Sequence, residues 1–414
     1  MELQGKKILV GITGGIAAYK VCEVISQLIQ AGASVRGVMT EAAREFITPL
    51  SISTLCRYPV ALDEHFWQPI HQQPLHIQLA EWADLLVIAP LTAHTLGKLA
   101  YGLADNLLTN TVLASTCPIL IVPAMNTDMW EQQVVQRNWI TICGDGGKAS
   151  PEEHRYHALE PTSGLLACDR LGKGRMAEPE AIYSYITSLL YTQGRRDLGG
   201  KKVLISGGST REYLDAVRFL GNPATGKMGI ALALAAYHRG AEVIFVAGNI
   251  DSSLLDSLPL LELIPVVTAL EMHHKMLHYF GEADITIMAA AVADLKPAQV
   301  YADKLPKSKL NSSLELSAVA DIVADLGNRK QPHQKLVGFA AQTGDIITPA
   351  QEKLRRKKLD AIAANPVDQP HSGFAGDYNQ AVLIDRHQRQ LQVLPCSKLH
   401  LAHHIFDFVR TIDR

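Results

Sequence analysis

A local pattern recurs along this chain: a short apolar run, a glycine-containing turn and then a segment with helical periodicity. In the first half, Gly14 and Gly15 separate an apolar run from a helical pattern that reaches Gln30. Short apolar strands that alternate with helices predict a parallel sheet covered on both faces. The runs expected to form its strands are residues 6–10, Ser34–Met39, Leu85–Ala89 and Ile119–Pro123.

The pattern restarts at Gly200, where Gly-Lys-Lys-Val-Leu-Ile echoes the Gly-Lys-Lys-Ile-Leu-Val of residues 5–10. Residues 191–199 are polar and contain glycine, so we expect them to be a linker. The predicted fold is therefore α/β, with two doubly wound, mainly parallel-sheet domains over residues 1–190 and 200–414. The expected elements of the second domain are strands at Val203–Ser206, Glu242–Ala247, Ile285–Ala290, Lys335–Phe339 and Ala361–Ala363, and a helix over Ile230–His238.

Composition excludes some classes of partner. A net charge of −2 over 414 residues gives no electrostatic reason to expect nucleic acid or an anionic membrane. The longest apolar runs have strand length, and the N-terminus has no apolar signal core. The six cysteines lack C-x-x-C or zinc spacing, which is typical of reduced thiols. We expect a cytoplasmic protein that acts on small molecules.

The first glycine turn suggests a phosphate site, although glycines also occur in turns that bind nothing. A dinucleotide fold usually ends its second strand with an acidic residue that holds the ribose. Here that strand ends Val38-Met39-Thr40, and Glu41 follows one residue later. The pattern therefore favours a ligand with one terminal phosphate, such as FMN, over NAD.

Three residues of the first half are candidates for catalysis. Pro74 suits a helix start, which places His76 in a first turn, where the helix dipole favours a neutral imidazole; an ordinary surface histidine is the more common alternative. Asn126 follows a buried strand and fits either a ligand site or a helix N-cap. Cys168 stands in a glycine-bearing segment near Arg170, where it is either a reactive thiol or a structural one.

At this point a resemblance becomes specific. In order along the chain come Ile12-Thr-Gly-Gly-Ile-Ala-Ala-Tyr-Lys20, Met39-Thr-Glu-Ala-Ala43, Ala89-Pro-Leu-Thr-Ala93, Ala104-Asp-Asn-Leu-Leu108, Pro123-Ala-Met-Asn126 and Ala167-Cys168…Gly174-Arg-Met176. Nearly the whole first half resembles the FMN-dependent phosphopantothenoylcysteine decarboxylases, a homo-oligomeric family. The resemblance implies His76 as base, Asn126 as the group that holds the substrate carboxylate and Cys168 as acid. It also implies FMN bound between subunits by Gly14, Gly15, Ile16, Thr40 and Thr92.

The chain departs from this family pattern after the cysteine. The family often has Ala-Cys-Gly-Asp, whereas Asp169 and Arg170 follow Cys168 here. This departure concerns the conformation of the loop and the acidity of the thiol, while the thiol itself is present.

The second half contains Gly221-Asn-Pro-Ala-Thr-Gly-Lys-Met228, which nearly matches a P-loop. Met228 stands where a Mg²⁺-binding hydroxyl is needed, and the preceding strand ends well before Gly221, so an ordinary P-loop is excluded. The ordered motifs instead resemble phosphopantothenate–cysteine ligases. They are Gly207-Gly-Ser-Thr-Arg-Glu212, Asn222…Gly226-Lys-Met-Gly229, Ala289-Ala-Ala-Val-Ala-Asp294, Val337-Gly-Phe-Ala-Ala-Gln-Thr343 and Ala363-Ala-Asn365.

This second resemblance implies CTP as cosubstrate and an acyl-cytidylate intermediate. Lys304 would assist formation of the cytidylate, and Asn222 would act in its conversion. The positions that match CTP-binding residues are Ala291, Asp294, Lys304, Asp321, Ile322, Phe339, Lys353 and Lys357. Taken alone, Asn222 is most simply a turn residue, and the basic run 353–358 is most simply a solvated helix face. Pro306 interrupts the usual Lys-x-Lys-Lys motif.

Decarboxylase motifs followed by ligase motifs are typical of the bacterial bifunctional family of coenzyme A biosynthesis. The resemblance predicts ligation of 4′-phosphopantothenate to cysteine with CTP and Mg²⁺, and then FMN-dependent decarboxylation to 4′-phosphopantetheine. No set of metal ligands stands out in the sequence. Two alternatives are a decarboxylase of peptidyl cysteine with a degenerate second half, and a non-catalytic flavin-binding inhibitor.

Overall fold

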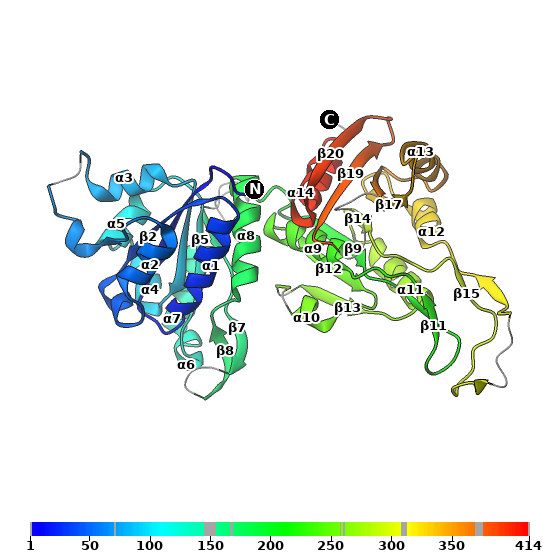
Figure 1. Cartoon of the computed structure of the whole chain (residues 1–414), viewed down its shortest axis with the longest axis horizontal. Helices are drawn as coiled ribbons and strands as arrows, with labels where there is room; N and C mark the ends of the chain where they lie inside the picture. Colours follow the sequence, from blue (N-terminus) through cyan, green and yellow to red (C-terminus); the bar gives the residue numbers. More distant parts are fainter. Residues whose placement is uncertain are drawn as a thin grey trace. The chain divides into compact units, whose positions relative to one another are not determined.

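The computed structural model describes residues 2–69, 72–144, 155–165, 169–256, 258–259, 261–307, 313–368 and 376–412. The chain forms two compact units, Met1–Asp197 and Leu198–Arg414 (Figure 1). The predicted linker at 191–199 contains the last two residues of helix α8 (Pro179–Thr192) and the division between the units. Each unit is built around its own sheet and is described separately.

The sheet of the first unit has six parallel strands in the order β3-β2-β1-β4-β5-β6. Its strands are β1 (Lys7–Ile12), β2 (Ser34–Met39), β3 (Ala61–Leu62), β4 (Leu85–Leu91), β5 (Ile119–Pro123) and β6 (Tyr156–Ala158). The other elements are α1 (Ala18–Gln30), η1 (Glu41–Glu45), α2 (Pro49–Cys56), η2 (Asp63–His65), α3 (Leu75–Trp82), α4 (Ala93–Tyr101), α5 (Leu107–Ala114), α6 (Thr127–Trp130), α7 (Gln133–Cys143), the hairpin β7 (Thr162–Leu165)–β8 (Leu171–Arg175), and α8.

Helices cover both faces of this sheet. One core joins it to α1, α2 and α8, and the other joins it to α3, α4, α5 and α7. The helix α1 shows why the sequence folds in this way, because Val21, Val24, Ile25 and Leu28 recur at helical spacing and are at most 1% exposed. Each such side chain contributes about 1.5–3 kcal/mol when fully buried.

The second unit contains an eight-stranded sheet in the order β13-β12-β9-β14-β17-β18-β19-β20. Its pairs are parallel up to β18, and β18–β19 and β19–β20 are antiparallel. The strands are β9 (Lys202–Gly207), β12 (Glu242–Ala247), β13 (Glu262–Pro265), β14 (Ile285–Met288), β17 (Lys335–Gln342), β18 (Ala361–Pro366), β19 (Tyr378–Asp385) and β20 (Gln390–Ser397).

Helices again cover both faces of the second sheet. One core contains residues of α9 (Lys227–His238) and α14 (Lys398–Arg410), and the other contains residues of α11 (Ala269–Phe280), α12 (Ile322–Arg329) and α13 (Ile347–Arg356). The smaller elements are α10 (Ser252–Leu255) and two short pairs, β10 (Arg211–Tyr213) with β11 (Phe219–Gly221), and β15 (Leu295–Pro297) with β16 (Leu316–Ala318).

The predicted fold class of two doubly wound α/β domains is confirmed. The bounds of some predicted strands needed correction. The first strand continues through Gly11 to Ile12, and the strand predicted over Ile285–Ala290 ends at Met288. Strands β13, β19 and β20 were not predicted. Within the described residues, the helices are too short or too polar to cross a membrane.

Both sheets reverse their strand order, between β1 and β4 in the first unit and between β9 and β14 in the second. Such a point opens a crevice beyond the carboxyl ends of parallel strands, where open α/β sheets bind ligands. The glycine turns after β1 and β9 both lie at these points.

Candidate functional site

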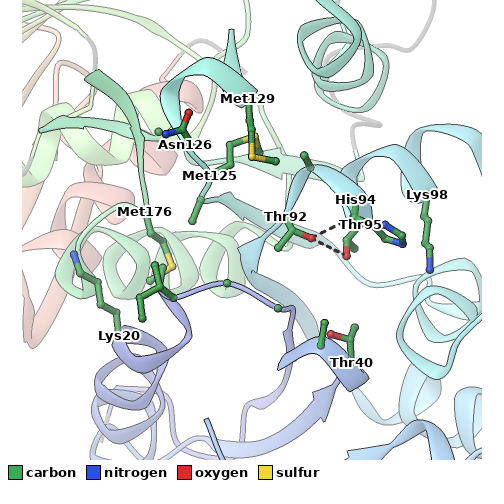
Figure 2. A pocket seen from close by; sticks show the side chains of 18 of the residues that line it. Lys20, Thr40, Thr92, His94, Thr95, Lys98, Met125, Asn126, Met129 and Met176 are labelled. Carbon is green, nitrogen blue, oxygen red and sulfur yellow. Dashed lines mark hydrogen bonds between the residues drawn. The ribbon is translucent and has the colours of Figure 1, made fainter. Parts of the chain in front are cut away.

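A cavity of about 910 Å³ lies at the switch point of the first unit (Figure 2). We call it the first cavity. All five residues predicted to hold a flavin line it, together with Asn126. Met125, Met129, Met176 and Ile16 add apolar surface to its wall. Its volume is in the range of small-molecule and cofactor sites, and the thioethers suit contact with an aromatic ring system.

Close packing fixes the glycine turn of the first cavity. A Cβ added to Gly14 would lie 2.5 Å from the Cβ of Ala42 and 2.8 Å from its carbonyl carbon, so this position requires glycine. The buried Thr13 joins the two strand ends, because its hydroxyl donates to the carbonyl of Pro90 at 2.6 Å and accepts from the amide of Thr92 at 3.1 Å. Sequence reasoning missed Thr13.

The two predicted threonines occupy helix starts. Thr92 caps α4, since its hydroxyl accepts from the amide of Thr95 at 3.3 Å. Thr40 precedes η1, and its amide donates to the carbonyl of Ile12 at 3.1 Å. The backbone around the cavity is therefore held in place before any ligand enters, which lowers the entropic cost of binding.

Asn126 is both a helix cap and a cavity residue. Its Oδ1 accepts from the amide of Asp128 at 2.8 Å at the start of α6, which is the N-cap alternative considered above. The hairpin β7–β8 packs against the same segment, because the amide of Met125 donates to the carbonyl of Gly174 at 3.0 Å. A side chain at Gly174 would collide with the Met125 carbonyl, so close approach of the hairpin depends on this glycine.

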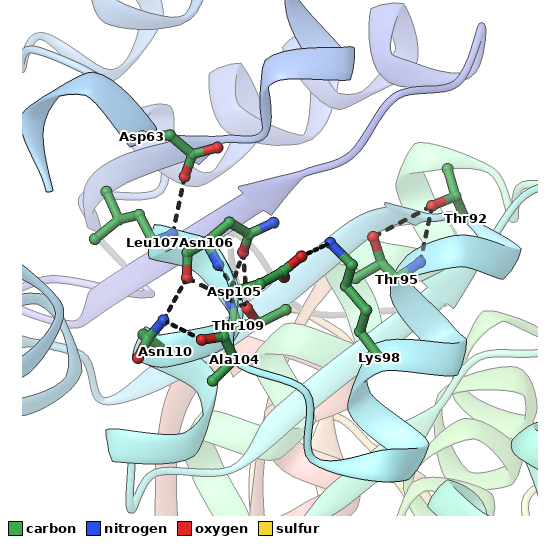
Figure 3. Close-up of polar contacts among 10 residues, drawn as sticks. All are labelled: Asp63, Thr92, Thr95, Lys98, Ala104, Asp105, Asn106, Leu107, Thr109 and Asn110. Atoms are coloured by element: carbon green, nitrogen blue, oxygen red, sulfur yellow. Dashed lines mark hydrogen bonds and ion pairs between the residues drawn. The ribbon is translucent and has the colours of Figure 1, made fainter.

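Most charges at the rim of the first cavity are paired. Lys98 and Asp105 are 2.7 Å apart, and this hydrogen bond lowers the pKa of Asp105 (Figure 3). Glu178 forms ion pairs with Lys20, at 2.8 Å, and with Arg175, at 2.7 Å. The neighbouring loop is also ordered by polar contacts, since Asp63 accepts from the amide of Leu107 and Asn106 caps α5 (Figure 3). The cavity therefore suits an uncharged ring with a phosphate at the glycine turn.

The predicted catalytic residues of the first unit are not all gathered in one cavity. His76 does occupy the first turn of α3, but it is not part of the wall of the first cavity. Its ring packs edge to face against Phe66, with the two ring centroids 5.3 Å apart. Its buried Nδ1 has no hydrogen-bond partner within the described residues. Cys168 lies outside the described residues. Two of the cations expected near it, Arg170 and Lys173, pair with Asp128 and Glu160 respectively.

A second cavity, of about 520 Å³, lies at the switch point of the second unit. The structure brings eight predicted residues together in its wall: Asn222, Ala291, Asp294, Asp321, Ile322, Phe339, Lys353 and Lys357. They come from the loop before α9, the segments after β14 and β16, the strand β17, and the end of α13. Residues more than 130 positions apart in sequence are thus joined by the sheet.

Two lysines give this cavity a positive wall. The Lys353 ammonium donates to the Phe339 carbonyl at 2.7 Å, and Lys357 pairs with Asp321 at 3.0 Å. Burial, aided by repulsion from Lys357, lowers the pKa of Lys353 to about 8. Burial raises the pKa of Asp321, but the hydrogen bonds from Lys357 and the Ala324 amide outweigh it and leave the pKa low.

The expected position of these lysines on one helix face needs a correction. The helix α13 ends at Arg356, and Lys357 is the residue after it. Its amide still donates to the Lys353 carbonyl at 3.0 Å, so helical spacing persists for one more residue and both side chains reach the cavity.

Asn222 ties two walls of the second cavity together. Its side-chain amide donates to the carbonyls of Ala291 and Val292, each at 3.3 Å. Gly226 has a φ of +85° at the N-cap of α9, a conformation that favours glycine. The loop before α9 is thus fastened to the turn that follows β14.

Lys304 lies apart from the other predicted residues. Its side chain is exposed and is not part of the cavity wall. The adjacent amide of Leu305 donates to Asp215 at 3.2 Å, which anchors this segment near the β10–β11 pair. The cavity residues that were missed as site residues include the polar or charged Lys227, Asn365, Asn379 and Lys398. The glycine–lysine pair at 226–227 was a usable signal for the first of them.

No group of three or more histidine, cysteine or acidic side chains in the described part of the chain is arranged to hold a metal ion. Two α/β units, each with a cavity at a strand switch point, define a class of α/β proteins with two candidate small-molecule sites. The first cavity is lined by glycine, threonine and methionine, and the second by lysine and aspartate.

Comparison with known proteins names the particular family. Residues 1–191 match the Flavoprotein family, and residues 198–412 match the DNA/pantothenate metabolism flavoprotein C-terminal domain. The chain is 41% identical to the coenzyme A biosynthesis bifunctional protein CoaBC of Bacillus subtilis, over 100% of this chain and 98% of that protein. It belongs to the family of bifunctional coenzyme A biosynthesis proteins, and the family prediction is confirmed.

Two further similarities have narrower coverage. A cysteine/cysteine sulfinic acid decarboxylase from an unknown prokaryotic organism is 41% identical over 82% of this chain and 92% of that protein. The crystal structure of the C-terminal domain of a CoaBC protein covers 52% of this chain and 97% of that domain, with 31% identity and a TM-score of 0.44.

Proposed function

We propose that this enzyme catalyses two consecutive steps of coenzyme A biosynthesis. The second unit joins 4′-phosphopantothenate to cysteine at the expense of CTP, and the first unit decarboxylates the product to 4′-phosphopantetheine with FMN. The observation that carries the proposal is the presence of two cavities in a member of this bifunctional family. Each cavity collects residues whose motifs match one of the two steps.

The residues of the first cavity fit FMN. The tight turn at Gly14 offers backbone amides to a phosphate, and the side chains of Thr40 and Thr92 add polar groups beside it. The methionines supply an apolar wall for the ring. When bound, FMN supplies the two-electron oxidation that makes loss of CO₂ from the cysteinyl carbon feasible, and then returns the electrons.

This chain's own residues would place and protonate the substrate. Asn126 would hold the substrate carboxylate through its amide, because its Oδ1 already caps α6. Cys168 would deliver a proton to the product as acid. His76 would serve as base in the cavity of a neighbouring subunit, which agrees with its place outside the first cavity of its own chain. The proposed protein is therefore a homo-oligomer with FMN at subunit interfaces.

The second cavity would hold CTP and the acyl-cytidylate formed from it. Lys353 and Lys357 would bind phosphate oxygens, while Ala291, Asp294, Ile322 and Phe339 would contact the rest of the nucleotide. Mg²⁺ would arrive on the phosphates, as is common for this ion. Asn222 would orient the intermediate for attack by the cysteine amine.

Lys304 would assist cytidylate formation only after its segment approaches the cavity, either on ligand binding or from a second subunit. In the present structure the Lys304 side chain is exposed and lies outside the cavity wall. A cytoplasmic location is the proposed setting for both steps.

Similarity to a cysteine/cysteine sulfinic acid decarboxylase favours a second candidate, direct decarboxylation of free cysteine in the first cavity. The lysine-lined second cavity speaks against it as the sole activity, because that candidate gives the second unit no task.

Purification of the full chain tests the proposal. The protein should be yellow, and it should release pyrophosphate from CTP only when 4′-phosphopantothenate is added. A colourless protein that cannot be loaded with FMN contradicts the role of the first unit, and amide formation without a nucleoside triphosphate contradicts that of the second.

A further inference from the structure

Three buried polar residues line a part of the second cavity that the proposed CTP residues do not explain. Lys398 is the first residue of α14, Asn379 lies in β19 and Asn365 lies near the end of β18. They are 6%, 4% and 7% exposed, yet all three line the cavity. A buried lysine is uncommon and is usually matched to a negative partner or ligand.

The charges around Lys398 leave this region positive. Lys227 begins α9 and repels Lys398, while Asp377 attracts it. Asp377 is already engaged at 2.6 Å by Lys227. Burial is the main reason that the pKa of Lys398 falls to about 8, and repulsion from Lys227 adds to it. One carboxylate is thus shared between two ammonium groups.

Backbone geometry adds to the attraction for an anion. The helices α9 and α14 pack together, and their first residues, Lys227 and Lys398, both line the cavity. Helix N-termini favour negative charge. A Cβ on Gly229 would lie 2.7 Å from the Cα of Gly207, so glycine at this position lets α9 start directly against the turn after β9.

The whole cavity has an excess of positive charge. Among the described residues, its charged side chains are four lysines and two aspartates: Lys227, Lys353, Lys357, Lys398, Asp294 and Asp321. Lys353 and Lys357 lie at the end of α13 and just after it, whereas Lys227 and Lys398 are the first residues of α9 and α14. A ligand with several phosphate groups, or two ligands with one phosphate-bearing end each, matches this arrangement better than a single carboxylate.

We propose that Lys398, supported by Asn365 and Asn379, is a phosphate-binding residue of the ligase cavity. The inference rests on the proposed ligase function and adds a residue outside the set that the motifs predicted. The phosphate belongs either to the nucleotide or to the 4′-phosphate end of the acyl substrate. Both carry the same chemistry, and separate arms of the experiment distinguish them.

The test compares Lys398→Met with Lys398→Arg in the full chain. Methionine keeps most of the buried aliphatic stem and removes the charge, whereas arginine keeps the charge. Lys202→Met is the matched control, because Lys202 pairs with Glu282 at the amino end of β9, opposite to the carboxyl-end cavity. Decarboxylation of synthetic phosphopantothenoylcysteine by the first unit serves as an internal measure of intact protein.

Titration calorimetry with CTP and Mg²⁺ is the first arm, and pyrophosphate release as a function of 4′-phosphopantothenate is the second. Lys398→Met should weaken the binding of one of these ligands about ten- to hundredfold, which is the usual effect of losing a hydrogen bond to a charged group. A larger Kd for CTP shows that the phosphate bound by Lys398 belongs to the nucleotide. An increased KM for 4′-phosphopantothenate at unchanged CTP affinity assigns the acyl substrate. Lys398→Arg should recover much of the loss, and Lys202→Met should bind normally.

Wild-type affinity for both ligands in folded Lys398→Met overturns the inference while leaving the ligase function intact. Wild-type protein that releases no pyrophosphate contradicts the proposed function instead. If Lys398→Met does not fold, Lys398→Gln replaces it in both arms, because glutamine removes the charge but keeps a polar head at the buried position. Wild-type affinity of folded Lys398→Gln for both ligands then overturns the inference.

Discussion

Substitution of Gly14 by alanine separates the packing of the first cavity from its chemistry. The new methyl group would lie 2.5 Å from the Cβ of Ala42 and 2.9 Å from its carbonyl oxygen, both shorter than real Cβ contacts. Because the backbone of Ala42 must move, we expect the free energy of unfolding to fall by about 1–3 kcal/mol, which is typical of overpacking. For a unit of this size, that loss lowers the melting temperature of the flavin-free protein by about 2–12 °C.

Gly15→Ala is the matched control from the same turn. Its Cβ would lie 3.8 Å from the nearest atom of Thr92, which is ordinary contact, so the flavin-free protein should keep its stability within about 0.5 kcal/mol. Tryptophan fluorescence reports on this unit alone in the full chain, since all tryptophans precede the second unit: Trp67, Trp82, Trp130 and Trp139.

The Gly14 variant should also retain less FMN, because the displaced Ala42 and its neighbour Glu41 line the cavity. Equal melting temperatures and equal flavin content in the two variants would refute the reasoning about this turn.

Three further predictions concern the two sites. CTP affinity should fall by up to about tenfold between pH 7 and pH 9, because Lys353, with a pKa of about 8, loses its proton in this range. Lys398 has a similar pKa, so the titration is repeated with Lys398→Met, and a Kd for CTP that does not change with pH in that variant contradicts the role of Lys353. Asn222→Asp replaces the amide that donates to the carbonyls of Ala291 and Val292 by a carboxylate, which repels them. Acyl-cytidylate should therefore accumulate, as measured by mass spectrometry of quenched reactions. Undiminished amide formation rules this out. Coexpression of His76→Asn with Asn126→Ala chains should restore decarboxylase activity that each variant lacks alone; no recovery in isolated mixed oligomers argues against sites shared between subunits.

The sequence was sufficient for the central parallel strands of both sheets, whereas the short parallel strands β3, β6 and β13 at the edges were missed. Continuous apolar runs such as Glu242–Ala247 form strands with the predicted bounds, because burial on both faces leaves a strong signal. The antiparallel edge was missed. In β20, Leu391 and Leu394 are exposed and only Val393 is fully buried, so the strand shows neither a continuous apolar run nor clean alternation.

Site residues were predictable where a motif accompanies them. Asp321 and Lys353 carry such signals and lie in the second cavity. Lys398 carries no such local signal, since it follows an unpredicted strand and reaches the cavity only through the packing of α14 against α9. The place of His76 outside the first cavity was not predictable, because its position after Pro74 places it in a helix turn but does not say which cavity that helix lines.

The most direct test of the two-step account uses cysteine labelled with ¹⁴C in its carboxyl group. Purified protein loaded with FMN is incubated with labelled cysteine, 4′-phosphopantothenate, CTP and Mg²⁺, and released ¹⁴CO₂ is trapped. The account predicts ¹⁴CO₂ only when both CTP and 4′-phosphopantothenate are present, with 4′-phosphopantetheine as the product. Release of ¹⁴CO₂ from cysteine alone, or none from the complete mixture, would contradict it.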